Sequence, residues 1–109
     1  EVPSGTKNPK SSNYETTYYN RDPKVIAWVL KQADGKCECC NSNSPFQKED
    51  GTPYLEVHHV QRLADDGEDT VQNAVALCPN CHRELHFGAD KHKIAESLSK
   101  KIERLKYQD

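Results

Sequence analysis

The pattern of apolar and polar positions divides the chain into a polar start and a series of short elements. Residues 1–21 are almost entirely polar and include prolines and a Ser/Asn run, so we expect a tail or linker. Asp22 and Pro23 then open a stretch with apolar residues at helical spacing, which ends at Gly35. These features predict a first helix, and a folded domain over residues 22–109.

The remainder alternates between short strand-like and helix-like segments. Residues 54–60 have strand composition and roughly alternate, and residues 74–77 are continuously apolar, so we expect two short strands separated by a polar turn. Helical spacing predicts one helix from about residue 79 to 88 and a last helix over about 90–106. The order of helix, knuckle, strand, turn, strand, helix and helix indicates a small α+β domain.

The composition indicates a small core that needs an additional source of stability. The chain has 109 residues, of which 34% are hydrophobic, below the usual share for a globular domain. A structural metal ion would stabilise such a domain, because its binding free energy is available only to the folded state. The net charge of −2 does not by itself indicate nucleic-acid binding.

The chain contains no apolar run long enough for a transmembrane helix and no signal segment. It begins at Glu1 without a Met, so we expect a fragment or a processed chain. Five cysteines, four of them in two close pairs, fit metal binding in a reducing compartment better than disulfides. We therefore expect a cytoplasmic protein.

The four paired cysteines predict a structural zinc site. Cys37 and Cys40 form one Cys-x2-Cys pair, and Cys78 and Cys81 form another. Four thiolates from two such pairs complete a tetrahedral shell with no open position, which is the structural form of zinc site. Cys39 is expected to be a spare thiol that packs against its neighbours.

A second metal site is indicated by histidines on the second of the three predicted helices. His82 and His86 are four residues apart on a predicted helix, so they share one face and suit two imidazoles on one ion. His82 directly follows Cys81, and adjacent helical residues point roughly 100° apart. Cys81 can therefore serve the zinc while His82 faces another site. His92 is expected to be a surface residue of the last helix.

His58 and His59 lie next to each other on the first predicted strand, where neighbours point to opposite faces. Both can serve one site only if the strand ends or bulges there, or if one of them acts through a phosphate or a water. We interpret the pair as a division of labour, in which one histidine binds metal and the other handles a proton. The alternative is that one packs in the core while the other is solvated. Glu56 is expected to be structural or solvated.

Together these residues resemble a known motif. The HNH endonuclease motif with zinc-binding cysteines is similar to Leu55-Glu56-Val57-His58-His59-Val60, Asp66-Gly67, Asn73 and Leu77-Cys78-Pro79-Asn80-Cys81-His82. The similarity runs from about residue 25 to 87. With the flanking Gly51-x-Pro53-Tyr54 and Arg83-Glu84-Leu85-His86, the chain looks especially like the C-terminal nuclease domain of modified-cytosine-specific (Mcr-type) restriction endonucleases.

The resemblance implies a ββα-metal fold and metal-dependent hydrolysis of phosphodiester bonds in double-stranded DNA. His59 matches the general base, and Asn73 matches the central Asn that braces the hairpin and orients the base; a simple turn-capping Asn is the alternative. His58, His82 and His86 match ligands of a catalytic divalent ion. The implied cofactors are a structural Zn²⁺ and a second divalent cation: Mg²⁺, Mn²⁺, Ni²⁺ or Zn²⁺. Imidazole ligands suit the transition ions better than magnesium.

Two departures from the family pattern are small. Asn41 stands where the family often has Gly after the first knuckle, and Asn tolerates the same left-handed turn. Asp66-Gly67 stands for Gly-Gly in the hairpin turn, which adds a negative charge near the expected DNA path. Arg62 and Arg83 are expected either to contact DNA phosphates or to be ordinary surface arginines.

Two other functions remain open at this point. A zinc-knuckle DNA-binding module without catalysis would explain the cysteines but would give the clustered histidines no role. A zinc-stabilised interaction domain would suit the net charge of −2. The resemblance leaves DNA specificity unassigned, and it allows an N-terminal DNA-reading domain and a dimer that cuts both strands. No membrane partner is expected.

Overall fold

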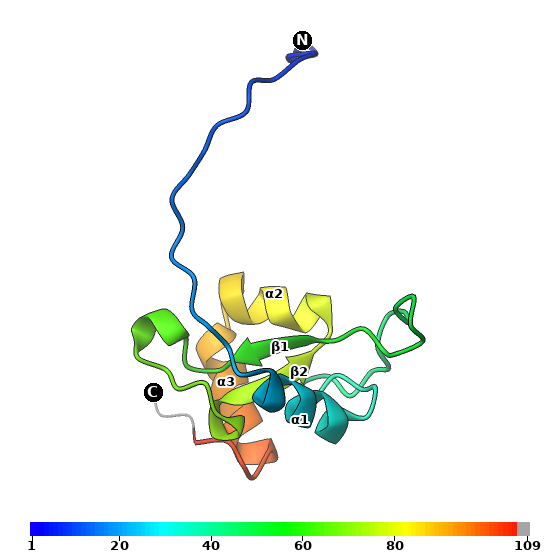
Figure 1. Ribbon diagram of the computed structural model, residues 1–109, viewed down its shortest axis with the longest axis vertical. Helices are drawn as coiled ribbons and strands as arrows, with labels where there is room; N and C mark the ends of the chain where they lie inside the picture. Colours follow the sequence, from blue (N-terminus) through cyan, green and yellow to red (C-terminus); the bar gives the residue numbers. More distant parts are fainter. Residues whose placement is uncertain (107–109) are drawn as a thin grey trace.

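The computed structural model describes residues 1–106, in which a two-stranded sheet is packed between helices (Figure 1). The regular elements follow the order α1 (Pro23–Ala33), β1 (Glu56–His59), β2 (Ala74–Leu77), α2 (Pro79–Phe87) and α3 (Lys91–Lys101), with 3-10 turns at Leu63–Asp65 and Val71–Asn73. The expected α+β class and the ββα core, formed by β1, β2 and α2, are confirmed. The last three residues of the expected domain, 107–109, lie outside the described residues.

Strand β2 separates two apolar layers because its side chains alternate between the faces of the sheet. All four of its residues are buried. Val75 and Leu77 pack into the cluster formed with α2 and α3, whereas the small Ala74 and Ala76 pack with Val29 of α1. One face of the sheet is therefore covered by α1 and the other by α2, with α3 packed beside α2.

The antiparallel register carries this division over to β1. His58 pairs with Val75 and Glu56 with Leu77, so both belong to the face that α2 covers. His59 pairs with Ala74 and so belongs to the face that α1 covers. Because β1 ends at His59, the next residues leave the sheet and form the loop that returns to β2.

Local capping explains where α1 begins and ends. The Asp22 side chain accepts a hydrogen bond from the Lys24 backbone N–H at 2.9 Å, and Pro23 occupies the first turn, as predicted. At the other end, Asp34 and then Gly35 adopt left-handed backbone conformations, with φ of 50° and 81°. In the first cysteine knuckle Asn41 has φ 64°, which confirms the expected left-handed turn.

The prediction that the last helix continues to residue 106 was wrong, because α3 ends at Lys101. The chain then turns so that Leu105 enters the core and is 6% exposed. Arg104 donates two hydrogen bonds to the Glu38 carboxylate, at 3.1 and 2.8 Å, and others to the carbonyls of Val71 and Ala74. These long-range contacts outweigh the helical spacing of the apolar residues.

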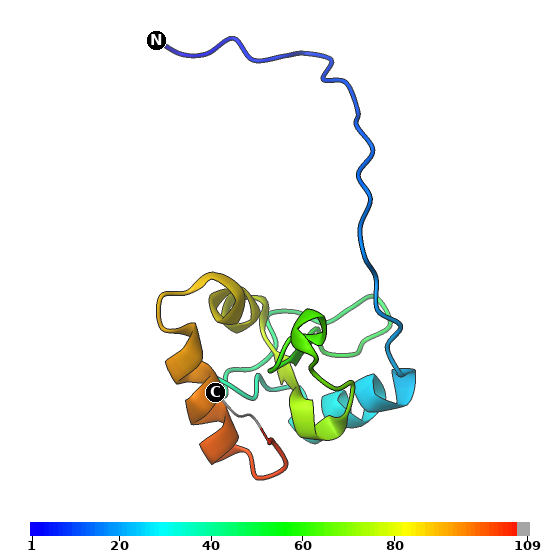
Figure 2. The ribbon, with the colours of Figure 1, turned by 90° about the vertical axis from the view of Figure 1, so that its left-hand side faces the viewer.

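The N-terminal arm, residues 1–21, is exposed and has neither helix nor strand, and it extends away from the rest of the molecule (Figures 1 and 2). At its end, the Asp22 backbone N–H donates a hydrogen bond to the Asp69 carboxylate at 2.6 Å. The arm is therefore tethered to the loop between the two strands. Within residues 1–106, every helix is too short or too polar to cross a membrane.

Candidate metal and catalytic site

The four paired cysteines lie together, although they come from distant parts of the chain. The sulfur atoms of Cys37, Cys40, Cys78 and Cys81 all lie within 4.8 Å of one another. Cys37 and Cys81 are buried, and the knuckle is closed by the Asn41 backbone N–H, which donates to the Cys37 carbonyl at 2.8 Å. A donor set of four thiols at this separation fits one tetrahedral ion of the zinc type.

The thiols of this cluster differ in their acidity. Hydrogen bonds from Ser42 lower the pKa of Cys40 to about 6, whereas burial is the largest cause that raises the pKa of Cys81. A bound cation would favour the thiolate form of both. Cys39 does not belong to the four; it packs against the core, and burial raises its pKa.

Three histidines form a second cluster on the α2 face of the sheet. Ring centroids of His58, His82 and His86 are 4.9 to 5.0 Å apart, and one nitrogen of each ring lies within 4.8 Å of the others. The Nε2 atoms of His82 and His86 are only 3.2 Å apart. Three convergent imidazoles fit a divalent ion and leave further coordination positions open.

Glu56 orients one of these imidazoles, a role that the sequence analysis missed. Its Oε1 lies 2.8 Å from Nδ1 of His82, and its Oε2 accepts a hydrogen bond from the Tyr54 hydroxyl at 2.6 Å. The Tyr54 hydrogen bond, and then that of His82, lower the pKa of Glu56. A carboxylate on Nδ1 favours the proton on that atom and leaves Nε2 free for a ligand role. The signal was available, since Glu56 is two residues from His58 and shares its face.

Burial favours neutral imidazoles at the cluster. Desolvation, followed by the nearby His82 and His86, lowers the pKa of His58 to about 3. Desolvation also lowers the pKa of His86, with smaller contributions from His82 and from nearby arginine and lysine side chains. Neutral imidazole is the form that binds metal.

His59 lies on the opposite face from His58 and has a carboxylate partner of its own. Its Nε2 is 2.8 Å from Oδ1 of Asp69, while Oδ2 of Asp69 accepts the Asp22 N–H. The His59 side chain is 5% exposed. Asp69 lies in the polar turn between the strands, and no periodic pattern in a loop could have assigned it to His59. The carboxylate fixes the position of the ring and which nitrogen carries a proton.

Asn73 binds the loop between the strands from both sides. Its Oδ1 accepts a hydrogen bond from the Gln61 N–H at 2.8 Å, and its Nδ2 donates to the carbonyls of Gln61 and Glu68 at 2.9 and 2.7 Å. The Asn73 side chain hydrogen-bonds to Gln61 and Glu68, so it holds the backbone next to Asp69, which in turn contacts His59. Gly67 is required in this loop, because a Cβ there would lie 2.0 Å from the Gln61 carbonyl oxygen.

A cavity of about 340 Å³, hereafter the histidine cavity, connects the two groups of histidines. His58, His59, His82 and His86 all line it, together with Arg62 and the arm residues Thr17, Tyr19 and Arg21, and with Val57, Leu63 and Ala64. The exposed Arg83 lies outside this lining, and its guanidinium sits over the Phe87 ring at 5.9 Å from the centroid. Of the two arginines proposed from sequence, only Arg62 therefore lines the histidine cavity.

Comparison with known proteins agrees with this arrangement. Residues 37–88, which include both the cysteine cluster and the histidine cluster, match the HNH endonuclease family. This chain contains an HNH endonuclease domain. The family resemblance inferred from the sequence is thereby confirmed.

Two restriction enzymes are similar to most of this chain. The Type IV methyl-directed restriction enzyme EcoKMcrA of Escherichia coli (strain K12) is 50% identical over 103 residues, which is 94% of this chain and 37% of that protein. The solved structure of the Type IV phosphorothioation-dependent restriction endonuclease ScoMcrA matches with a TM-score of 0.66 and 37% identity, over 74% of this chain and 16% of that one. The chain thus spans about a third of the first and about a sixth of the second.

Proposed function

We propose that this HNH domain is the nuclease of a restriction-type enzyme and hydrolyses phosphodiester bonds in double-stranded DNA with a divalent metal ion. The observation that carries the proposal is the convergence of His58, His82 and His86 in a cavity that His59 also lines. The HNH match and the two restriction-enzyme relatives support the same reaction.

The two clusters would hold two ions with different tasks. The Cys37, Cys40, Cys78 and Cys81 cluster would hold a structural Zn²⁺ that joins the first knuckle to the start of α2. The histidine cluster would hold the catalytic ion, for which Zn²⁺ and Ni²⁺ suit imidazole ligands better than Mg²⁺ or Mn²⁺ do. When bound, that ion would supply Lewis-acid stabilisation of the phosphate and of the leaving oxygen.

His59 would act as the general base that takes a proton from the attacking water, the step that a neutral imidazole performs near neutral pH. Asp69 would position this base, since its carboxylate holds Nε2 at 2.8 Å and leaves Nδ1 for the water. Asn73 would support the pair indirectly by holding the backbone of the loop that carries Asp69. The resemblance implied that Asn73 itself orients the base, whereas we propose that Asp69 orients it and that Asn73 only supports Asp69.

Arg62 would contact a DNA phosphate at the mouth of the histidine cavity. Its side chain is 64% exposed, and its ion pair with Asp65 is long, at 4.0 Å, so the guanidinium can exchange this partner for a phosphate. Arg83 stacks on Phe87 beyond the cavity and would contact the DNA backbone only at its periphery.

Selection of the DNA would belong to other parts of the full protein. The two relatives are described as methyl-directed and phosphorothioation-dependent, and each extends well beyond the matched region. We place recognition in an N-terminal reader domain, with residues 1–21 as a linker and residues 22–109 as the nuclease. Dimerisation would allow cleavage of both strands. The free thiols favour the reducing cytoplasm.

Plasmid nicking by the His59→Ala variant tests the mechanism. We expect the wild type to nick supercoiled DNA with at least one of Zn²⁺, Ni²⁺, Mn²⁺ and Mg²⁺, and His59→Ala to lose roughly 100-fold or more of the rate. Metal content and circular dichroism should be unchanged, and Gln72→Ala serves as an exposed control in the connection between β1 and β2. Retained nicking by folded His59→Ala would refute the assignment. A wild type that binds DNA but cleaves with none of these ions would favour a non-catalytic zinc-knuckle module.

A further inference from the structure

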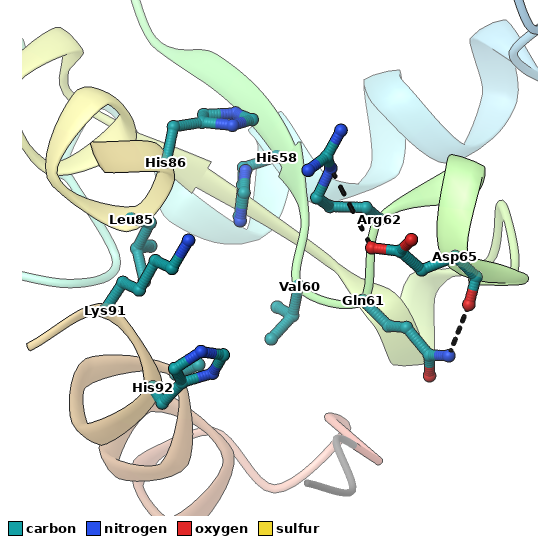
Figure 3. Close-up of a pocket in the computed structure, with 10 residues that line it drawn as sticks. His58, Val60, Gln61, Arg62, Asp65, Leu85, His86, Lys91 and His92 are labelled. Carbon is teal, nitrogen blue, oxygen red and sulfur yellow. Dashed lines mark hydrogen bonds and ion pairs between the residues drawn. The ribbon is translucent and has the colours of Figure 1, made fainter. Parts of the chain in front are cut away.

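A second cavity, hereafter the α3 cavity, adjoins the histidine cavity on the side of helix α3. It has a volume of about 240 Å³, several times the roughly 30 Å³ share of one water molecule. The two cavities share His58, Arg62 and His86, so the α3 cavity continues the site past the proposed metal ligands (Figure 3). Nothing in the reaction proposed above uses it.

The cations of the α3 cavity come from two separate elements. Arg62 follows β1, and Lys91 begins α3; Figure 3 shows the Lys91 side chain reaching toward His58 from the opposite wall. Asp65 is the only carboxylate among the lining residues, and it lies 4.0 Å from Arg62. Within residues 1–106, no carboxylate oxygen lies within 4.0 Å of the half-buried Lys91 ammonium. The cavity thus presents a cation without a counter-ion.

The other residues that line the α3 cavity strengthen the attraction of the Lys91 ammonium for an anion. Val60, Leu85 and Ala95 are buried and form an apolar part of the wall. A charge beside apolar groups attracts an anion more strongly than the same charge in open water does, because the local dielectric constant is lower. The opposite wall is held in place by the Gln61 side-chain amide, which donates to the Asp65 carbonyl at 2.9 Å.

We propose that the α3 cavity binds a DNA backbone phosphate next to the one that is cleaved, with Lys91 as its main positive ligand. This inference rests on the proposed nuclease function. Arg62, which lines both cavities, would lie between the two phosphates. The bound phosphate would fix the register of the strand relative to His59 without taking part in the reaction.

The effect of Lys91 therefore falls on DNA binding and not on the chemical step. Each phosphate neutralised by a lysine contributes about −0.9 to the slope of log K against log salt for duplex DNA. Loss of one such contact corresponds to about a five- to tenfold weaker affinity near 0.1 M salt. The Michaelis constant for cleavage should rise by a similar factor, while kcat changes less than about twofold.

The experiment compares Lys91→Gln with Lys93→Gln, which removes the same charge two residues further along α3, outside the α3 cavity. Both changes are placed in the His59→Ala background, so that the DNA stays intact, and fluorescence anisotropy measures duplex binding at several salt concentrations. Lys91→Gln should weaken binding five- to tenfold and reduce the salt slope by about 0.9. Lys93→Gln should change neither, and Lys91→Arg should restore both.

Two results would overturn the inference: equal affinities and slopes for Lys91→Gln and its parent, or the same loss in Lys93→Gln. Thermal unfolding and metal content check that each variant is folded. The outcome is separable from that of the nuclease proposal. A Lys91-specific binding loss in a protein whose wild type never cleaves DNA would retain the phosphate site and reject the nuclease.

Discussion

Replacing Glu56 should weaken ion binding at the histidine cluster while leaving the cysteine cluster unchanged. The Glu56 carboxylate lies 2.8 Å from Nδ1 of His82, and the Tyr54 hydroxyl holds its other oxygen at 2.6 Å. Glu56→Gln retains an acceptor of the same shape but removes the charge, whereas Glu56→Ala removes the acceptor as well. In both variants the proton of His82 is held less strongly on Nδ1, so Nε2 is less favoured as a free ligand atom for the ion.

The magnitude follows from the hydrogen bond and its exposure. A hydrogen bond to a charged group contributes about 1.5–3 kcal/mol and a neutral one about 0.5–1.5 kcal/mol, so Glu56→Gln loses about 1 kcal/mol. The side chains of His82 and Glu56 are 23% and 30% exposed, and solvent screening places the loss at the lower end of that difference. We expect about fivefold weaker metal binding for Glu56→Gln, and about 10- to 100-fold for Glu56→Ala.

Calorimetric titration of Ni²⁺ or Mn²⁺ into protein whose cysteine cluster already holds Zn²⁺ measures this effect. Tyr54→Phe is the matched control, since it keeps the carboxylate and removes only its supporting hydroxyl; its loss should be smaller than that of Glu56→Gln. Tightly bound zinc should stay at one equivalent in all variants. If Glu56→Ala binds the titrated ion as tightly as wild type, Glu56 does not orient His82.

Three further changes test other parts of the structure. Cys81→Ser should unfold the domain, because structural zinc supplies about 10–16 kcal/mol and a domain has only about 5–15 kcal/mol of net stability; circular dichroism should show coil, whereas His82→Ala stays folded and inactive. Asp69→Asn should lower kcat by about 10- to 100-fold with metal content unchanged, because Asp69 supports only part of the rate enhancement that a general base supplies. An unaltered kcat in steady-state cleavage would argue against the positioning role of Asp69. Arg104→Lys should lower the unfolding free energy by about 2–3 kcal/mol in urea titrations, since the two-pronged contact with Glu38 is only 17% and 12% exposed; a change below about 0.5 kcal/mol would contradict the anchoring of the C-terminal segment.

Elements with local signals were predictable from the sequence. Asp22 and Pro23 mark the start of α1, and the residues after Cys78 mark the start of α2, because caps and helical spacing depend on near neighbours. The end of α3 was missed because it depends on Arg104 reaching Glu38, 66 residues away in the chain. Nothing in the local spacing around residue 102 reports such a contact.

The two candidate metal-ligand sets also have local signals in the sequence. Two Cys-x2-Cys pairs and a His-x3-His pair specify which side chains can share an ion, because knuckle and helix geometry set the distances within each pair. The sequence alone thus determined the type of ligand in each cluster and, through the HNH resemblance, the class of reaction to expect.

Only the tertiary structure decided how the remaining groups are paired. Strand alternation predicts that His58 and His59 point to opposite faces of the sheet. Only the register with β2 determined that His58 lies with the histidines of α2 and that His59 contacts Asp69. Glu56 acquired its role when α2 brought His82 within 2.8 Å, and Lys91 became part of a cavity when α3 packed beside α2. Such pairings depend on loop closure and packing between distant segments, which no periodic pattern in the sequence records.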